Sequence, residues 1–252
     1  MNAGDAVRRH LLTHAAAALP LLAGCGTWSL PSPEPMELLL IQGEGPYAAP
    51  TLVVMLPGAY SQPGEFADEG FIDALRTAQV PADVLVAGAT LGHYVEGRVV
   101  ERLHDEVVAP ARARGVRSVW LLGVSLGGLF ALSYASRHAD QLDGVLLLAP
   151  YLGRRTLLAE IDAAGGPEAW AAGRRPRADD LPEHEVWAWL ATRPSVPPLY
   201  LGFGRDDRFA DAHRRLAARL PRGHVDEIDG GHDWPAWRAL WQRFLQRGRV
   251  GA

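Results

Sequence analysis

The stretch Gly123-Val124-Ser125-Leu126-Gly127 constrains the fold of this chain more than any other. It follows the apolar run 116–122 and precedes the helix-like run 128–135, an order that predicts a buried strand, a sharp turn and a helix. A serine at such a turn stands clear of the sheet only on a strained backbone. Large side chains two positions before and after it would collide with the neighbouring strand and helix, and glycine at both positions removes these collisions.

Strands and helices alternate along the rest of the chain. Continuous apolar runs are typical of strands buried on both faces, and amphipathic segments between them predict helices. We expect strands at 36–42, 51–56, 82–88, 143–150, 197–204 and 224–228, and helices at 71–79, 96–114, 210–220 and 235–246. Pro110 is expected to kink or end the second of these helices. The alternation predicts an α/β protein with a mostly parallel central sheet and helices on both faces.

Composition fits a globular chain and narrows its chemistry. Of 252 residues, 48% are hydrophobic and 21% are charged, and the formal net charge of −4 argues against a nucleic-acid partner. All 25 basic residues are arginine, which excludes catalysis by a lysine Schiff base. No metal-ligand spacing or phosphate-binding loop occurs, so we expect no metal and no cofactor. His104, His138, His184 and His213 show no ligand spacing and are interpreted as helix-surface or loop residues.

The N-terminal segment has the features of an export signal. Arg8, Arg9 and His10 precede the apolar run 11–22, which ends in Leu-Ala-Gly before Cys25, the single cysteine. This end resembles the lipobox of bacterial lipoproteins, whose cysteine is lipidated and becomes the mature N-terminus. The resemblance implies a signal peptide over 1–24, a Pro/Ser-rich tether over 25–35, and membrane attachment in the cell envelope through a lipid anchor. The alternative is a cytoplasmic protein with an unprocessed extension.

Candidate catalytic groups follow the last two expected strands, where functional groups gather in an open parallel sheet. Asp206 and Asp207 come after the strand at 197–204, and His232 comes after the strand at 224–228. A serine, a histidine and an aspartate are the groups that acyl transfer uses as nucleophile, base and orienting acid. We favour Asp207 as the acid and keep Asp206 as the alternative, because spacing alone does not separate adjacent residues.

Three motifs together resemble the α/β-hydrolase fold serine hydrolases over residues 36 to 248. They are Gly-Val-Ser-Leu-Gly-Gly at 123–128, Gly-Arg-Asp-Asp at 204–207 and Gly-Gly-His at 230–232. In such a fold the oxyanion hole takes one backbone N–H from Leu126, after the nucleophile, and another from the loop around Ala59. The residues 153–193 occupy the place of a small helical lid insertion within a hydrolase domain over 36–252.

The expected activity is therefore that of a monomeric serine hydrolase. It would cleave small carboxylic esters or thioesters through an acyl-enzyme on Ser125. Two alternatives remain open: an acyltransferase or peptidase that uses the same three groups, and a non-catalytic envelope lipoprotein that uses the fold as a binding scaffold. The insertion contains Trp170, Trp187 and Trp189. These tryptophans either line an acyl pocket or fasten the helices of the insertion to the body, and we favour the second role.

Overall fold

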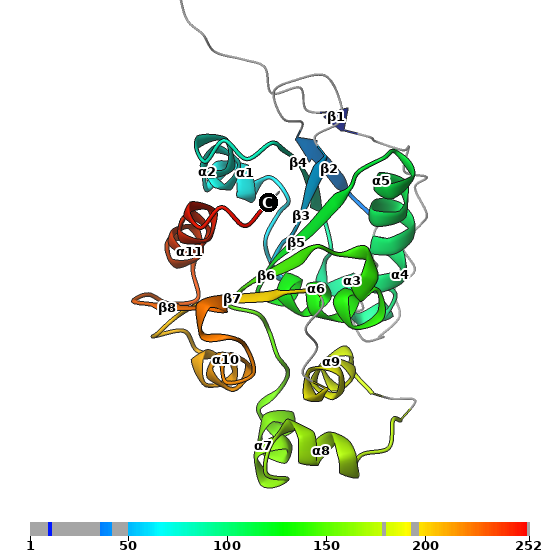
Figure 1. Ribbon diagram of the computed structural model, residues 1–252. Coiled ribbons are helices and arrows are strands. Elements are labelled where there is room, and N and C mark those ends of the chain that lie inside the picture. Colours follow the sequence, from blue (N-terminus) through cyan, green and yellow to red (C-terminus); the bar gives the residue numbers. More distant parts are fainter. Residues whose placement is uncertain (1–9, 12–35, 42–49, 178–179, 193–196, 251–252) are drawn as a thin grey trace, which may run out of the picture.

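A single sheet forms the centre of the computed structural model, which describes residues 10–11, 36–41, 50–177, 180–192 and 197–250. Its strand order is β1-β2-β4-β3-β5-β6-β7-β8 (Figure 1). The strands are β1 (His10–Leu11), β2 (Leu38–Ile41), β3 (Thr51–Leu56), β4 (Ala82–Ala87), β5 (Ser118–Val124), β6 (Gly144–Leu148), β7 (Leu199–Gly204) and β8 (Val225–Ile228). Strands β3 to β8 run parallel, whereas β1 and β2 are antiparallel to their neighbours. The predicted mostly parallel sheet is confirmed.

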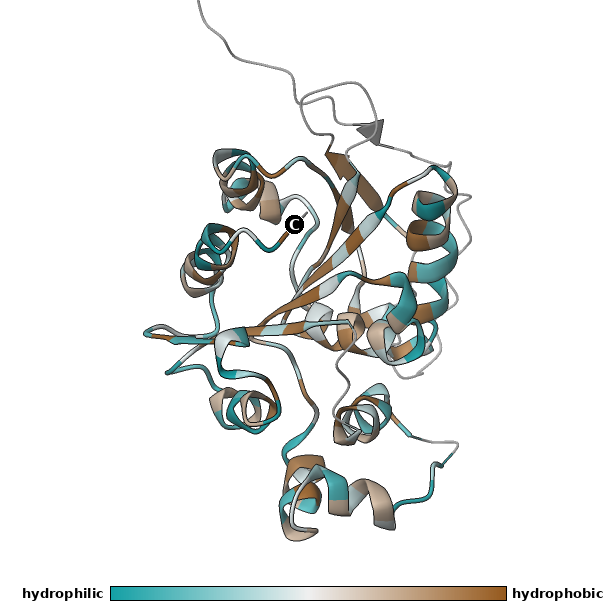
Figure 2. Ribbon diagram, in the orientation of Figure 1, coloured by the Kyte–Doolittle hydropathy of each residue, from teal (hydrophilic) through white to brown (hydrophobic). Residues whose placement is uncertain are grey.

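Helices cover both faces of this sheet. In Figure 1, three helices lie to its left, namely α1 (Glu65–Asp68), α2 (Phe71–Thr77) and α11 (Trp234–Gln246). The opposite face carries α3 (Leu91–Glu96), α4 (Val99–Leu103), α5 (Ala109–Ala113), α6 (Leu126–Arg137) and α10 (Ala210–Ala217). Figure 2 shows the apolar colouring concentrated on the strands and on the helix sides that face them.

Strand β3 shows why the apolar runs of the sequence are unbroken. Leu52, Val54 and Leu56 pack in the core that contains α6. The alternate residues Val53 and Met55 pack in the other core, with α2 and α11. Because each face of the strand meets a layer of helices, all its residues are buried.

The segment expected to be one helix over 96–114 is divided in the structure. It consists of α4, a π-helical turn (His104–Val108) and α5, while α3 precedes it. Pro110 lies in the first turn of α5, directly after the π-helical turn. Such π-helical turns are rare and occur mostly as single turns within α-helices.

The insertion between β6 and β7 is helical and is fastened to the body by a buried tryptophan. It comprises α7 (Arg155–Ala163), α8 (Pro167–Gly173) and α9 (Pro182–Ala191). The Trp187 side chain is fully buried in the core that contains α6. Its indole N–H donates to the Leu152 carbonyl at 2.8 Å. Trp170 is also buried, and Trp189 is partly buried against the same core, so these side chains pack the insertion onto the body.

A buried carboxylate ties the insertion to α3. Glu183 in α9 is 1% exposed and accepts a hydrogen bond from the Tyr94 hydroxyl at 3.1 Å. Gly153 has a φ of 109°, and a Cβ there would lie 3.1 Å from the Glu183 Cγ. The chain therefore passes close to Glu183 just before α7 begins.

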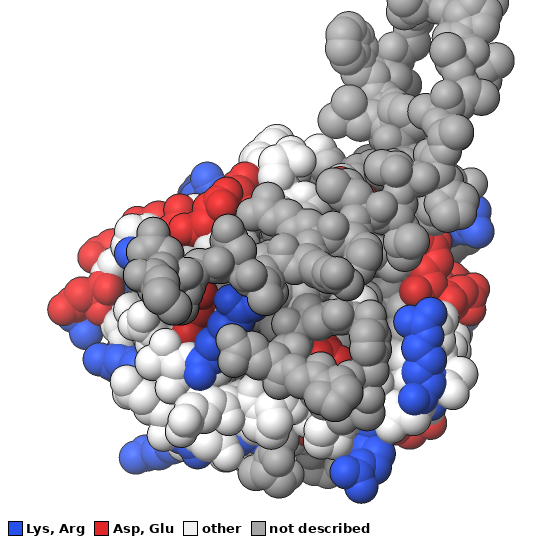
Figure 3. Space-filling model, turned by 90° about the horizontal axis from the view of Figure 1, so that it is seen from above, with Lys and Arg blue, Asp and Glu red and all other residues white. Residues whose placement is uncertain are grey.

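The N-terminal predictions are not tested by the fold. Cys25, the signal peptide expected over 1–24 and the tether over 25–35 lie outside the described residues, apart from His10 and Leu11, whose backbones pair with β2. Among the helices that the structure describes, none is long and apolar enough to cross a membrane. On the face seen in Figure 3, acidic and basic side chains are interspersed around the rim.

Replacing Trp187 tests whether it fastens the insertion to the body. Trp187→Ala should lower the free energy of unfolding by about 3–5 kcal/mol, because it leaves a cavity in the core and an unpaired carbonyl. Trp189→Ala, two residues along the same helix and partly exposed, is the control and should cost about 1 kcal/mol. Urea unfolding followed by circular dichroism measures both values, and equal losses would contradict this account.

Candidate active site

Ser125 occupies a strained turn between β5 and α6. Its backbone has φ 52° and ψ −115°, a combination that costs a non-glycine residue about 1–3 kcal/mol. The surrounding chain holds this conformation from both sides. The Ser125 N–H donates to the Leu148 carbonyl at 3.0 Å, and the Ser125 carbonyl accepts from the N–H groups of Gly128 at 3.0 Å and Tyr151 at 2.8 Å.

The glycines around Ser125 have the steric role that the sequence predicts. A Cβ on Gly123 would lie 2.3 Å from the Gly127 carbonyl oxygen, at the start of the helix. A Cβ on Gly127 would lie 2.1 Å from the carbonyl oxygen of Leu56, at the end of β3. Both contacts involve backbone atoms, so no side-chain rotation relieves them. The turn can form only with glycine at these positions.

The structure brings Ser125, His232 and Asp207 into one hydrogen-bonded line. The His232 Nε2 lies 2.9 Å from the Ser125 Oγ, and its Nδ1 lies 2.7 Å from the Asp207 Oδ2. The other carboxylate oxygen of Asp207 accepts from the Phe209 N–H at 2.7 Å. These contacts fix the imidazole tautomer with the proton on Nδ1, which leaves Nε2 free to accept a proton from the serine.

The two adjacent aspartates have different environments. The Asp207 side chain is fully buried against the imidazole, whereas Asp206 is exposed to solvent. The Asp206 N–H donates to the Gly230 carbonyl at 3.0 Å, so its backbone joins the two loops while the residue stays exposed to solvent. The structure thus places the favoured acid, and not the alternative, beside the histidine.

Close backbone contact brings the loops after β7 and β8 together. A Cβ on Gly204 would lie 2.2 Å from the Gly230 carbonyl oxygen. Gly230 has a φ of 133°, a conformation that favours glycine. The glycines in the two C-terminal motifs therefore set the distance between the acid and the histidine.

Two aromatic rings hold the imidazole, and the sequence reasoning missed both. The His232 ring meets Phe209 edge to face, with ring centres 5.2 Å apart, and meets Trp237 in the same way at 5.1 Å. Phe209 directly follows the Asp-Asp-Arg segment, and Trp237 lies on the apolar face of α11. An aromatic residue just after a candidate acid is the signal that could have identified the first of them.

The residues expected to form the oxyanion hole flank Ser125. The Leu126 N–H is the first of α6 and so has no acceptor within the helix. On the other side, a Cβ on Gly58 would lie 3.5 Å from the Ser125 Cβ, which places the loop containing Ala59 directly beside the serine. Tyr60, the next residue, is 88% exposed.

The Asp207 carboxylate is ionised at neutral pH. Burial raises its pKa, but hydrogen bonds from His232 and from the Phe209 N–H outweigh burial and hold the pKa below its ordinary value. A permanent negative charge at this position can stabilise a protonated His232. Among the described residues, no group of histidine, cysteine or acidic side chains could hold a metal ion.

His213 is buried next to this site, which corrects its interpretation as a helix-surface or loop residue. It lies in α10 with no exposed surface, and its Nε2 donates to the Pro150 carbonyl at 2.9 Å. Burial lowers its pKa to about 4, although the nearby Asp207 charge acts in the opposite direction. His213 is therefore a neutral imidazole beneath the Asp207 loop.

The low pKa of His213 predicts a pH dependence of stability. Its pKa is about 4 in the folded state against 6.5 for a free histidine. The unfolded chain therefore binds a proton first as the pH falls below 6.5, and about 3 kcal/mol of stability is lost by pH 4. His213→Gln keeps an N–H donor but cannot be protonated. Between a pH well above 6.5 and pH 4, the free energy of unfolding should fall about 3 kcal/mol less in this variant than in the wild type. Equal losses in the two proteins would contradict the prediction.

Comparison with known proteins places the chain in a family. The family model Esterase, described as "Putative esterase", matches residues 89–246. No curated protein sequence matches the chain. Among solved structures, an S-formylglutathione hydrolase of Staphylococcus aureus is 15% identical with a TM-score of 0.60, covering 85% of this chain and 90% of its own.

Two further structures have the same fold. The fluorophosphonate-binding serine hydrolase F of Staphylococcus aureus is 15% identical, with a TM-score of 0.61 and coverage of 85% of this chain and 92% of its own. A monoacylglycerol lipase of Paleococcus ferrophilus is 18% identical, with a TM-score of 0.56 and coverage of 85% and 98%. These similarities show the α/β-hydrolase fold, and the family match covers more than half of the chain. The chain is a hydrolase that belongs to the esterase family.

Proposed function

We propose that this hydrolase cleaves carboxylic esters or thioesters through an acyl-enzyme formed on Ser125. The line of hydrogen bonds from the Ser125 Oγ through His232 to Asp207, at 2.9 and 2.7 Å, carries the proposal. A serine hydroxyl is a weak nucleophile unless a base within hydrogen-bond reach removes its proton. His232 is such a base, and buried Asp207 fixes its orientation.

Acylation begins when the Ser125 Oγ attacks the carbonyl carbon of the substrate. The serine proton moves to the His232 Nε2, and the carbonyl oxygen becomes an oxyanion. The N–H groups of Leu126 and Ala59 are the proposed donors to that oxygen. Collapse of the intermediate breaks the bond to the alcohol or thiol, which takes the proton from His232 as it leaves.

Deacylation repeats these steps with water. His232 removes a proton from the water as it attacks the acyl carbonyl, and then returns a proton to the Ser125 Oγ as the acid departs. The ionised Asp207 lowers the free energy of the imidazolium that forms in both halves of the reaction. Access for water at this stage distinguishes a hydrolase from an acyltransferase, in which another acceptor attacks.

The names of the structural neighbours support both carboxylic esters and thioesters as substrate classes. One is a hydrolase of S-formylglutathione and another is a monoacylglycerol lipase. The chemistry of Ser125 is the same for both classes, because the leaving group differs while the attacked carbonyl does not. We therefore propose a small acyl substrate and assign no chain length.

Labelling with a fluorophosphonate probe tests the nucleophile. The wild-type protein should be labelled, and Ser125→Ala should neither bind the probe nor turn over p-nitrophenyl esters.

The adjacent residues Asp206 and Asp207 give a matched pair of variants that tests the acid. Asp207→Asn should lower kcat about ten-thousand-fold, because the imidazole loses its tautomer and its counter-charge. Asp206→Asn should stay within about two-fold of wild type, and comparable losses in both variants would refute this assignment of the acid.

We also propose, from the sequence of residues 8–25, that the chain is exported and anchored to the cell envelope by a lipid on Cys25. Mass spectrometry of the protein from its native host should find a lipidated N-terminal Cys25. An intact Met1 with a free thiol would refute this and would favour the cytoplasmic alternative.

A further inference from the structure

A cavity of about 580 Å³ is lined by residues of α7 and α10 and of the segments just before them. Tyr151 and Phe209, which belong to this lining, both contact residues of the candidate site. The Phe209 ring contacts His232, and the Tyr151 N–H donates to the Ser125 carbonyl at 2.8 Å. The two rings contact each other edge to face, with centres 5.9 Å apart. Phe209 therefore contacts His232 and also lines the cavity.

The lining of this cavity carries an excess of positive charge. Four arginines and two aspartates contribute to it, namely Arg154, Arg155, Arg208, Arg215, Asp162 and Asp211. Both aspartates already have partners. Asp162 receives two hydrogen bonds from Arg215, at 2.9 and 2.5 Å, and Asp211 lies 3.3 Å from Arg214, outside the cavity.

Three arginines of the lining remain without a carboxylate. Arg154, Arg155 and Arg208 form no ion pair with any acidic group in the part of the chain that the structure describes. Two of them lie near aromatic side chains of the lining, Phe209 and Tyr151. The Arg208 guanidinium lies over the Phe209 ring, 4.9 Å from its centre. Burial raises the pKa of Tyr151, and the nearby Arg154 charge acts in the opposite direction.

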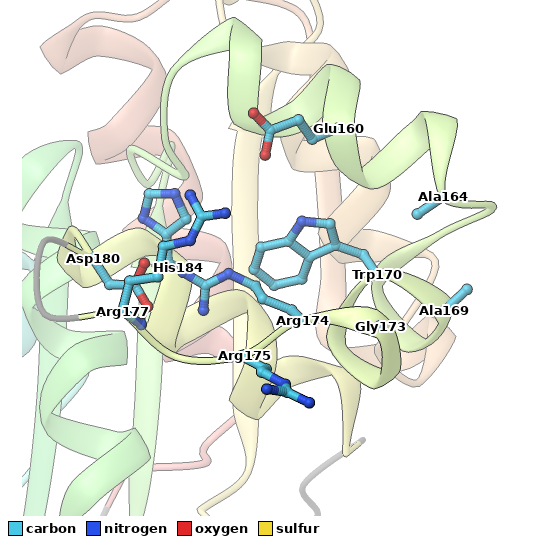
Figure 4. Close-up of a pocket in the computed structure, with 10 residues that line it drawn as sticks. All are labelled: Glu160, Ala164, Ala169, Trp170, Gly173, Arg174, Arg175, Arg177, Asp180 and His184. Atoms are coloured by element: carbon cyan, nitrogen blue, oxygen red, sulfur yellow. Dashed lines mark hydrogen bonds and ion pairs between the residues drawn. The ribbon is translucent and has the colours of Figure 1, made fainter.

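A second cavity, within the insertion, also contains arginines but is lined by a different set of residues. It has a volume of about 710 Å³ and is lined by residues of α7, α8, α9 and the loop between the last two (Figure 4). Its Arg174 lies over the Trp170 ring and forms an ion pair with Asp180. This cavity does not include the rings that hold His232, so it has no comparable connection to the reacting groups.

We propose that the cavity between α7 and α10 binds an anionic group, a carboxylate or a phosphate, carried by the substrate. Guanidinium groups form paired, charge-assisted hydrogen bonds with such groups, and the volume lies within the range of about 300–1,000 Å³ that is usual for small-molecule sites. The inference rests on the proposed function, since it names the substrate class of the same site. The anionic group can belong to the acyl part or to the leaving group.

Two pairs of test substrates distinguish these sources. For the acyl part, p-nitrophenyl hydrogen adipate is compared with p-nitrophenyl heptanoate, which has a similar length and no charge. For the leaving group, meta-acetoxybenzoate is compared with meta-acetoxybenzamide. The quantity measured is the ratio of kcat/KM for the anionic over the neutral member. We expect this ratio to exceed unity in one pair, and to fall as salt is added because salt screens exposed charges.

Substitution of the arginines should remove the preference. In the triple variant Arg154→Gln, Arg155→Gln, Arg208→Gln, the ratio should fall about ten-fold in the pair that shows it, an effect typical of losing charged hydrogen bonds at a partly exposed site. Arg205→Gln is the matched control for Arg208→Gln. It lies in the same loop after β7, pairs with Asp229 and does not line the cavity, so its removal should leave the ratio unchanged.

The outcomes separate this inference from the proposed function. Normal hydrolysis of the neutral esters with an unchanged ratio in the triple variant would overturn the anion site alone. If the wild type hydrolyses none of the four substrates, the proposed function is instead refuted. In that event, calorimetric binding of p-nitrophenyl hydrogen adipate and meta-acetoxybenzoate to Ser125→Ala, with and without the three arginines, still decides the anion site. Equal binding of both compounds in the presence and absence of the arginines would overturn it.

Discussion

The contact between the Ser125 turn and the end of β3 is the constraint on which the site depends. The Gly127 backbone lies so close to the Leu56 carbonyl that a Cβ would approach it to 2.1 Å. This contact fixes where α6 starts and forces Ser125 into a conformation that L-residues seldom adopt. The strain is held by hydrogen bonds from β6 and from the chain after it. The hydroxyl therefore stands at the end of the parallel strands, where other loops can reach it.

The second half of the site uses the same physical device. Gly204 and Gly230 lack side chains where their loops touch, and this contact allows His232 to reach Ser125 on one side and Asp207 on the other. Phe209 and Trp237 restrict the imidazole by packing rather than by polar contacts. The same Phe209 ring connects the site to the arginine-lined cavity, so orientation of the base and recognition of substrate charge would share one side chain.

Local sequence patterns predicted the strands and the strained turn, because each of these depends on residues that are close in sequence. Ser125 and His232 were predicted because each stands just after an expected strand. The choice between Asp206 and Asp207 did not follow from spacing, since it depends on backbone pairing between the loops after β7 and β8. The burial of His213 was missed for a similar reason: it faces the Pro150 carbonyl, which belongs to a distant segment. The cationic cavity joins residues near 154 with residues near 208, and no local pattern could have shown that they meet.

Rapid quenching followed by mass spectrometry shows whether Ser125 forms a covalent acyl intermediate. The protein would be mixed with a p-nitrophenyl ester, quenched in acid within the first turnover and digested. We expect release of one p-nitrophenol per protein molecule, together with an acyl adduct on the peptide that contains Ser125. An acyl adduct on a different residue would rule out Ser125 as the nucleophile.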